Sequence, residues 1–506
     1  MAEEPELTAA RVATGSIYLT LQNILSTAIG VLGYGFMARM ISREEMGVVA
    51  ALTLLATLIS LLSGFGLNQT LAKFVSELKG RKEDVSTHVV SALSFRAPVS
   101  FLLALALFAS SSHLSNLLFR TNAYSSLMAL LAADSFLISV SPLLNSVLWG
   151  LGKLKEMATY TISSRTIRWA CIAAFLMNGY GLFGVLLGWV IGDLTLLLLY
   201  SFKVKNYVKF SGQKSLEGLS CLPELLRFSW PLYLASTVYF LYTWYDRALI
   251  LAFLPLSDLG VYNIAYMAFS MLASIAMSLG SALLPYYGMA YGRNDHKAIT
   301  AGIRRASKYT MLVMFPLALG LATAAKPTIT LFADQQYEQG WPILATLSLF
   351  GLVYGLSPAL SNLLLIYGKT KTILLLNLVS VVSSLALLPL VRLLNLTGLA
   401  VVRGASLLLT FTLSLHFISK TVKIEIDREV AAKTLASSVV MAVAVTAIQQ
   451  LIYSKLLLPL YIATGATIYI TAIRTLKTLN QEDAQLIKQI TGERYSKYIS
   501  KILDAK

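Results

Sequence analysis

Long apolar stretches separated by short polar segments run through almost the whole chain of 506 residues. A helix needs about 20 mainly apolar residues to cross the hydrocarbon part of a bilayer. Fourteen stretches approach that length, at residues 15–40, 46–68, 90–110, 122–149, 156–178, 181–201, 228–252, 258–284, 309–325, 341–366, 372–391, 395–418, 431–452 and 456–474. The pattern therefore predicts an all-α polytopic membrane protein with about fourteen transmembrane helices.

The chain also contains an internal repeat. Residues 141–155 (SPLLNSVLWGLGKLK) resemble residues 357–371 (SPALSNLLLIYGKTK) at an offset of 216, and residues 41–48 resemble 254–261 at an offset of 213. The repeat relates spans one to six to spans seven to twelve and leaves two helices at the end. Because six is an even number, both halves enter the membrane from the same side. We therefore expect two parallel six-helix repeats, an architecture typical of transporters.

The repeat and the polar segments together predict the division of the chain. We expect an N-lobe at 1–201, a cytoplasmic linker at 202–227, a C-lobe at 228–418, spans thirteen and fourteen at 419–475, and a tail at 476–506. The tail alternates apolar and basic residues at helical spacing, which is typical of an amphipathic helix on the membrane surface. No polar segment is long enough for a separate folded domain, which argues against a membrane glycosyltransferase or polymerase.

Composition and charge give the orientation. Charged residues make up 13% of the chain, about half of the roughly 25% found in soluble proteins. With a cytoplasmic N-terminus, the cytoplasmic loops hold 22 lysines and arginines, and the outer loops and helix ends hold six. By the positive-inside rule, we expect a multi-pass protein of the cell membrane with both termini in the cytoplasm. The same bias explains the net charge of +16 without a nucleic-acid partner.

Little in the chain points to an enzyme. Cys171 and Cys221 are too few for a disulfide framework or a thiolate metal site, and only four histidines are present. There is no glycine-rich phosphate-binding motif. We expect no catalytic residue, no metal site and no cofactor; coupling to H⁺ or Na⁺ is left open.

Ionisable residues inside the spans are the main functional signal, since each costs about 2.5–3.5 kcal/mol at the bilayer centre. Arg165 and Arg168 lie near the middle of span five and, three residues apart, share a helix face. They are expected to line a water-filled cavity or to pair with Asp134 and Asp193, near the middle of spans four and six. These two carboxylates are candidates for ion coupling or for a structural charge pair.

The repeat bears on the role of these two arginines. Their counterparts in the second half are Val381 and Ser384, so the architecture does not require arginine there. A cationic cavity suits an anionic substrate, and guanidinium binds phosphate well because it is planar, permanently charged and bidentate. Arg96, in the inner half of span three, and Arg39, at the end of span one, are further candidates for this substrate site.

Two other features remain ambiguous. Asp246 and Arg247, near the outer end of span seven, and Arg403, in the outer part of span twelve, form either structural charge pairs or part of a coupling site. Pro142 and Pro358 interrupt spans four and ten at equivalent places. Each is either a hinge for a rocking motion or a packing kink.

With these features the chain resembles the Wzx-like polysaccharide flippases of the multidrug/oligosaccharidyl-lipid/polysaccharide (MOP) superfamily. The resemblance covers essentially the whole chain and is carried by residues 38–47, 148–155, 244–250, 259–266 and 331–344. It implies two six-helix bundles around a central cavity, working by alternating access, and a monomer that is associated with glycan-assembly enzymes or acts alone. The implied substrate is a polyprenyl-(pyro)phosphate-linked oligosaccharide, moved from the inner to the outer leaflet for polysaccharide export or protein glycosylation.

Two alternatives stay open. A cation-coupled multidrug exporter of the same superfamily would share the fold, but its cavity is expected to be acidic and aromatic rather than rich in arginine. A membrane scaffold for glycan assembly would not need arginines in the middle of the bilayer.

Overall fold

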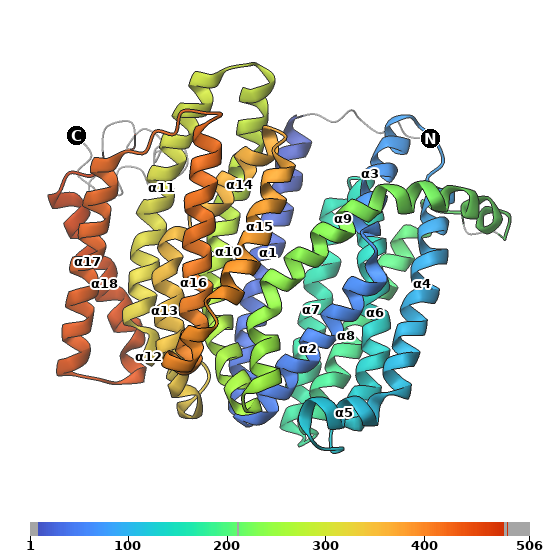
Figure 1. The fold of residues 1–506 in the computed structure, drawn as a ribbon, viewed down its shortest axis with the longest axis horizontal. Coiled ribbons are helices and arrows are strands. Elements are labelled where there is room, and N and C mark those ends of the chain that lie inside the picture. Colours follow the sequence, from blue (N-terminus) through green and yellow to red (C-terminus); the bar gives the residue numbers. More distant parts are fainter. Residues whose placement is uncertain (1–8, 210–211, 480–482, 484–506) are drawn as a thin grey trace. The chain divides into compact units, whose positions relative to one another are not determined.

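In the computed structural model, which describes residues 9–209, 212–479 and 483, every regular element of the described chain is helical (Figure 1). The all-α prediction is confirmed. The chain divides into two compact units, Met1–Asn263 and Ile264–Lys506. Each unit is a bundle of long helices, and each is described here by itself.

The first unit contains nine helices among its described residues. They are α1 (Ala9–Met40), α2 (Arg43–Gly64), α3 (Leu67–Gly80), α4 (Ser86–Ala109), α5 (Ser111–Phe119), α6 (Ser125–Gly150), α7 (Leu154–Met177), α8 (Gly181–Val204) and α9 (Gly212–Phe253). Helix α7 packs between α1 and α8, and α6 packs on α4 and α8. Buried leucines and valines from α3, α4, α6 and α8 form an apolar core in this unit.

Short polar motifs set the helix boundaries around α2. At its start Ser42 and Glu45 form a capping box: the Glu45 amide donates to Ser42 Oγ at 3.2 Å, and the Ser42 amide donates to Glu45 Oε2 at 2.8 Å. At its end the chain turns through Phe65 and Gly66, both with positive φ. Glycine is favoured at the second position because it has no Cβ to clash in that conformation.

Helix α3 was not predicted by the sequence reasoning, which treated the region after span two as a loop. It is amphipathic: Leu67, Leu71, Val75 and Leu78 are buried, and the opposite face carries charged residues. Its apolar face packs on α6 and α9. Four apolar residues at helical spacing are a detectable signal, but the helix is too short to stand out in a search for spans.

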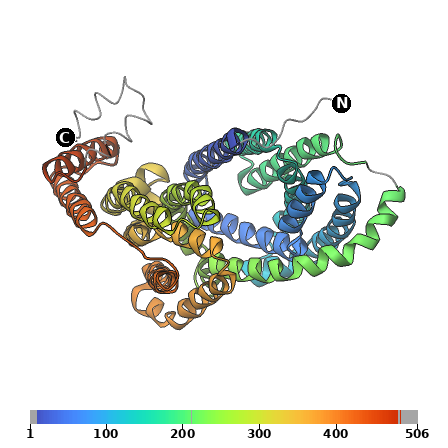
Figure 2. The ribbon, with the colours of Figure 1, turned by 90° about the horizontal axis from the view of Figure 1, so that it is seen from above.

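The second unit contains helices α10 (Leu256–Gly292), which begins in the first unit, and α11 (His296–Thr323), α12 (Ala325–Phe332), α13 (Trp341–Tyr354), α14 (Ser357–Ile366), α15 (Thr370–Ala386), α16 (Pro389–Ser419), α17 (Arg428–Leu451) and α18 (Leu458–Thr475), with two short 3₁₀ turns, Gln335–Gly340 and Lys455–Leu457. Helices α17 and α18 lie side by side, and α17 packs on α11 (Figure 2).

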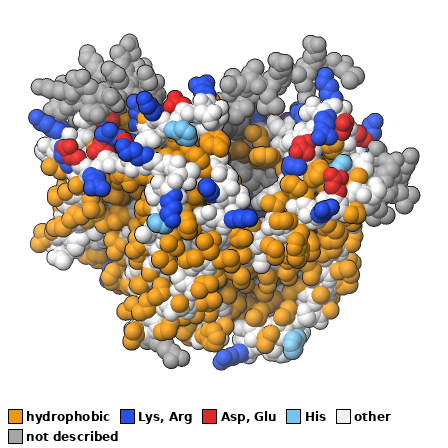
Figure 3. Space-filling view, turned by 45° about the horizontal axis from the view of Figure 1, so that its top comes forward, with side chains coloured by type: hydrophobic (Ala, Val, Ile, Leu, Met, Phe, Trp, Pro, Cys, Tyr) orange, Lys and Arg blue, Asp and Glu red, His pale blue; other side chains and the backbone are white. Residues whose placement is uncertain are grey.

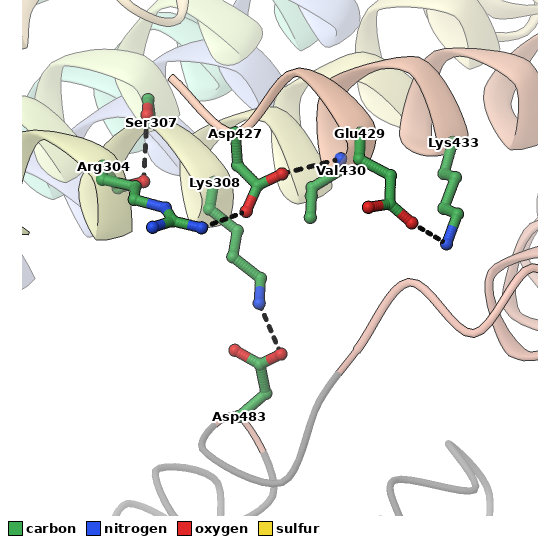
Figure 4. A network of polar contacts seen from close by, with 8 residues as sticks. All are labelled: Arg304, Ser307, Lys308, Asp427, Glu429, Val430, Lys433 and Asp483. Atoms are coloured by element: carbon green, nitrogen blue, oxygen red, sulfur yellow. Dashed lines mark hydrogen bonds and ion pairs between the residues drawn. The ribbon is translucent and has the colours of Figure 1, made fainter. Parts of the chain in front are cut away.

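Polar contacts at the start of α17 connect it to α11 (Figure 4). Asp427 caps α17, since its Oδ1 accepts from the Val430 amide at 3.2 Å, while its Oδ2 accepts from Arg304 Nη2 of α11 at 3.0 Å. Nearby, Lys308 Nζ of α11 lies 2.6 Å from Asp483 Oδ2. The rest of the predicted amphipathic tail beyond residue 479 lies outside the described residues.

The helices agree with the predicted spans in position. Among the described residues, eleven helical segments are long and apolar enough to cross a membrane. One of them, Gln335–Ile366, includes both α13 and α14. The three remaining predicted spans coincide with α7, which carries Arg165 and Arg168, with the second part of α9, and with the 17-residue helix α15. The total of fourteen spans stays a prediction.

The predicted domain boundaries also stay predictions, because they follow the repeat rather than packing. Helix α9 contains the seventh predicted span, yet it packs on α2, α3 and α4 and belongs to the first compact unit. It begins at Gly212, within the predicted linker.

The surface has the distribution expected of a membrane protein. On the face seen in Figure 3, hydrophobic side chains cover a broad band, and most charged side chains gather at its upper end. Large apolar side chains such as Phe253, Leu393 and Leu451 are exposed. In water such exposure would promote aggregation, whereas lipid covers it in a bilayer.

Candidate functional site

Arg168 of α7 is paired with Asp193 of α8. Arg168 Nη1 lies 3.1 Å from Asp193 Oδ2, and the two side chains are 26% and 12% exposed. The guanidinium also lies 4.8 Å from the centre of the Trp189 ring, a cation–π contact. Gly192 permits this arrangement, because a Cβ at that position would overlap the side chain of Arg168.

Asp134 of α6 completes a cluster of charges with this pair. Its side chain is 1% exposed, and its Oδ1 has no hydrogen-bond partner among the described residues. The charges of Asp193 and Arg168 lie near enough to act on its carboxyl group electrostatically. Three helices thus place two carboxylates and one guanidinium near one another inside the bundle, where an isolated charge would be costly.

Arg165 differs from Arg168. It lies one turn earlier on α7 and is exposed, and it has neither an ion pair nor a hydrogen bond within the described part of the chain. The charges of Arg168 and Asp193 and the hydroxyls of Tyr34 and Tyr200 lie near enough to act on it electrostatically. Arg165 is therefore the member of this cluster that has no bonded partner among the described residues.

Arg96 of α4 is separate from that cluster. It is 1% exposed, its Nη1 donates to Asn68 Oδ1 of α3 at 2.7 Å, and its Nε has no partner in the described structure. Arg39 is exposed in the last turn of α1. The four predicted substrate-site arginines thus occupy three different settings.

Asp246 and Arg247 form a buried network in the first unit. Asp246 Oδ2 accepts from the Tyr262 hydroxyl at 2.6 Å, and Asp246 Oδ1 lies 3.8 Å from Arg247 Nη1. Arg247 Nη1 also donates to the Thr243 carbonyl at 3.2 Å, and the guanidinium lies 4.7 Å from the centre of the Trp244 ring. A buried ion pair is tolerated when further hydrogen bonds satisfy its polar atoms, and the contacts of Asp246 and Arg247 fit a structural role of this kind.

The second unit contains a different set of polar contacts at the repeated positions. Ser384, the counterpart of Arg168, donates to Ser406 Oγ of α16 at 2.8 Å. Arg403 of α16 lies over the ring of Tyr266, and its Nη2 donates to the Tyr266 hydroxyl at 3.2 Å. At the position where the first unit has Arg168, the second unit therefore has a serine hydroxyl that bonds to a neighbouring helix.

The two prolines occupy different local structures despite their equivalent positions in the sequence. Helix α6 continues through Pro142, and nearby serine hydroxyls bond to its backbone: Ser141 Oγ donates to the Leu137 carbonyl and Ser146 Oγ to that of Pro142, both at 2.8 Å. Pro358 lies in the first turn of α14, after α13 has ended at Tyr354. Only the second repeat is broken there into two helices.

These helices define a polytopic membrane protein with a fold known from solved transport proteins. The structure of lipid II flippase MurJ in an inward closed conformation matches with a TM-score of 0.72 and 16% identity, covering 91% of this chain and 98% of that one. The eukaryotic MATE transporter AtDTX14 matches with a TM-score of 0.60 and 16% identity, covering 86% and 99%.

The family follows from the sequence itself. A family model described as "Polysaccharide biosynthesis protein" matches residues 36–342, more than half of the chain, so the chain belongs to that family. The chain is 23% identical over 483 residues to the probable low-salt glycan biosynthesis flippase Agl15 of Haloferax volcanii, covering 91% of this chain and 95% of the relative. It is 24% identical over 321 residues to the succinoglycan biosynthesis transport protein ExoT of Rhizobium meliloti, covering 62% and 60%.

Proposed function

We propose that this protein is a flippase that moves a polyprenyl-(pyro)phosphate-linked oligosaccharide from the inner to the outer leaflet by alternating access, for polysaccharide export or protein glycosylation. The observation that carries the proposal is Arg165, an exposed residue whose side chain has no ion pair or hydrogen bond among the described residues and which lies within a predicted span of a polysaccharide-biosynthesis family member. Relatives named as a glycan flippase and a polysaccharide transport protein support it.

The physical problem that such a protein solves is the transfer of hydroxyl groups and charge through hydrocarbon. Polar groups without hydrogen-bond partners cost several kcal/mol each in that environment. In this proposal Arg165 receives the phosphate group, and Arg168, held by Asp193, adds positive potential beside it. Arg39, which is exposed at the end of α1, is proposed to extend the cationic surface, whereas Arg96 is buried.

Return of the transporter to its starting state needs an energy source. We infer that the Asp134–Asp193 carboxyl pair takes up a proton or a sodium ion, because two carboxylates and one guanidinium meet there. The membrane potential is a further source, at about 2.3 kcal/mol per charge per 100 mV. Both termini are proposed to be cytoplasmic, in a monomer of the cell membrane, on the strength of the loop charges.

Reconstitution tests the function. Purified protein is placed in liposomes containing a fluorescent polyprenyl-diphosphate oligosaccharide, and the exposure of the glycan to an added membrane-impermeant glycosidase is followed over time. A flippase makes the glycan of the inner leaflet accessible, whereas liposomes without protein do not. Efflux of a cationic dye in the absence of glycan movement would favour a drug exporter, and the absence of both activities would favour a scaffold.

A further inference from the structure

A polar and aromatic pocket lies within the first unit, and Arg165, Arg168, Asp134 and Asp193 are not among its lining residues. It has a volume of about 270 Å³ and is lined by residues of α2, α3 and α9 and of the α2–α3 turn. This volume lies just below the roughly 300–1,000 Å³ of typical small-molecule sites, so it suits a single ring-sized group rather than a whole oligosaccharide.

One wall of the pocket is aromatic. Phe240 and Trp244, one turn apart on α9, place their ring centres 6.4 Å apart with an angle of 27° between the planes, and Tyr239 stands beside them. Aromatic rings pack well against the C–H face of a pyranose ring, which is the apolar side of an otherwise hydroxyl-rich molecule.

Other residues that line the pocket carry hydrogen-bonding groups. Asn68 Oδ1 accepts a bond from the buried Arg96, which fixes the amide and leaves its NH₂ group to donate elsewhere. Ser236 and Gln69 also line the pocket, and neither has a side-chain hydrogen bond within the described residues. The pocket is therefore lined by neutral donors and acceptors, and Arg96, which is not among the lining residues, holds the Asn68 amide.

We propose that this pocket binds one sugar ring of the transported glycan, as a saccharide subsite distinct from the cationic site at Arg165. The inference rests on the proposed function and adds where the glycan is recognised. A neutral polyhydroxylated ring suits both kinds of lining group, because its faces pack on the aromatic rings and its hydroxyl groups bond to the amides of Asn68 and Gln69. Arg96 acts as a positioning residue, through Asn68.

Occupancy of the pocket can be measured without transport. Cys171 and Cys221 are replaced by serine, Ser236→Cys is introduced, and the rate of labelling by a polar maleimide is followed in a detergent that has no sugar head group. Methyl glycosides of hexoses and N-acetylhexosamines serve as probes. We expect at least one of them to slow labelling in a saturable way. If no glycoside slows labelling, or if only a cationic aromatic dye does, the proposal is overturned.

Two substitutions locate the effect. Asn68→Asp keeps a partner for Arg96 but removes the NH₂ donors, and Phe240→Leu removes one ring at nearly constant volume. Each is expected to raise the glycoside concentration needed for half-protection by about two- to tenfold, the range for one aromatic contact or hydrogen bond. Phe253→Leu, at the exposed end of the same helix, is the matched control and should change nothing. Equal protection in all variants would contradict the assignment.

The outcome is separable from that of the proposed function. If liposomes with the parent protein move no lipid-linked glycan but glycosides still protect the introduced thiol of the Ser236→Cys variant, flipping is wrong and the saccharide pocket stands. If glycan moves at the normal rate in Phe240→Leu and glycosides do not protect, the flippase stands and the pocket assignment is wrong.

Discussion

Replacing Asp193 by asparagine removes the countercharge of Arg168 while keeping the shape of the side chain. Breaking a fully buried ion pair costs about 3–5 kcal/mol, because the remaining charge is left uncompensated. Here the side chains are 26% and 12% exposed, so part of that cost is screened by solvent, and the neighbouring Asp134 supplies some compensation. We therefore expect Asp193→Asn to lower the free energy of unfolding by about 2 kcal/mol.

The contribution of the pair itself is measured with a double-mutant cycle of Asp193→Asn and Arg168→Gln, in SDS titrations followed by circular dichroism. If the groups interact as described, the double variant is more stable than the sum of the single effects predicts, by about 1–2 kcal/mol. Glu77→Gln is a matched control, since its partner Lys73 lies at 3.2 Å but both side chains are more than 40% exposed. Its expected cost is about 0.3–0.5 kcal/mol. A coupling energy between residues 168 and 193 that is no larger than the loss of stability in the control variant would refute the reasoning.

Three further predictions follow from the packing. Gly33→Ala should destabilise the first unit by about 1–3 kcal/mol in the same titration, because a Cβ there would overlap the Trp169 ring, whereas Gly30→Ala, with open space around it, should not; equal effects would contradict this packing. Tyr262→Phe should cost about 1–3 kcal/mol by removing the hydroxyl that donates to buried Asp246, and Tyr239→Phe, at an exposed side chain, should cost almost nothing. The Val430 amide and Arg304 hold the pKa of Asp427 below its usual 3.8. The stabilising effect of the Asp427 carboxylate should therefore be complete above about pH 4 and be lost as the pH falls through the lowered pKa. Acid unfolding curves of the parent and of Asp427→Asn should converge at that low pH, and a constant difference at all pH values would show that ionisation of Asp427 is not involved.

Much of the helical architecture is predictable from the sequence because hydrophobic length is a strong constraint in a bilayer. Eleven predicted spans reappear as long apolar helices. The prediction is least complete where a helix is short or charged, as in α3, whose apolar face covers only a few turns. The division into two compact units was not predicted. The sequence repeat groups helices by their shared origin, but the contacts between helices place α9 with the first unit.

The candidate site was predictable in part. Because charge is costly in hydrocarbon, the sequence alone singles out Arg165, Arg168, Asp134 and Asp193. It does not show which of the two arginines is paired. The spacing along α7 puts both arginines on one face, and only the position of Asp193 on α8 distinguishes them. The pocket lined by Asn68 and Trp244 was not predicted. Its lining comes from two segments, residues 57–69 and 236–244, that are more than 150 positions apart in the sequence, and none of these lining residues is charged.

The central claim is that an unpaired arginine on α7 serves a flippase by receiving the phosphate of a lipid-linked glycan. The most direct test is the rate of glycan exposure in liposomes containing Arg165→Gln, compared with Arg120→Gln, an arginine in the turn after α5. The account predicts that Arg165→Gln slows movement by about tenfold or more, the effect of losing one charged hydrogen bond of about 1.5–3 kcal/mol, and that Arg120→Gln moves glycan at the parent rate. Equal rates in both variants would contradict the claim.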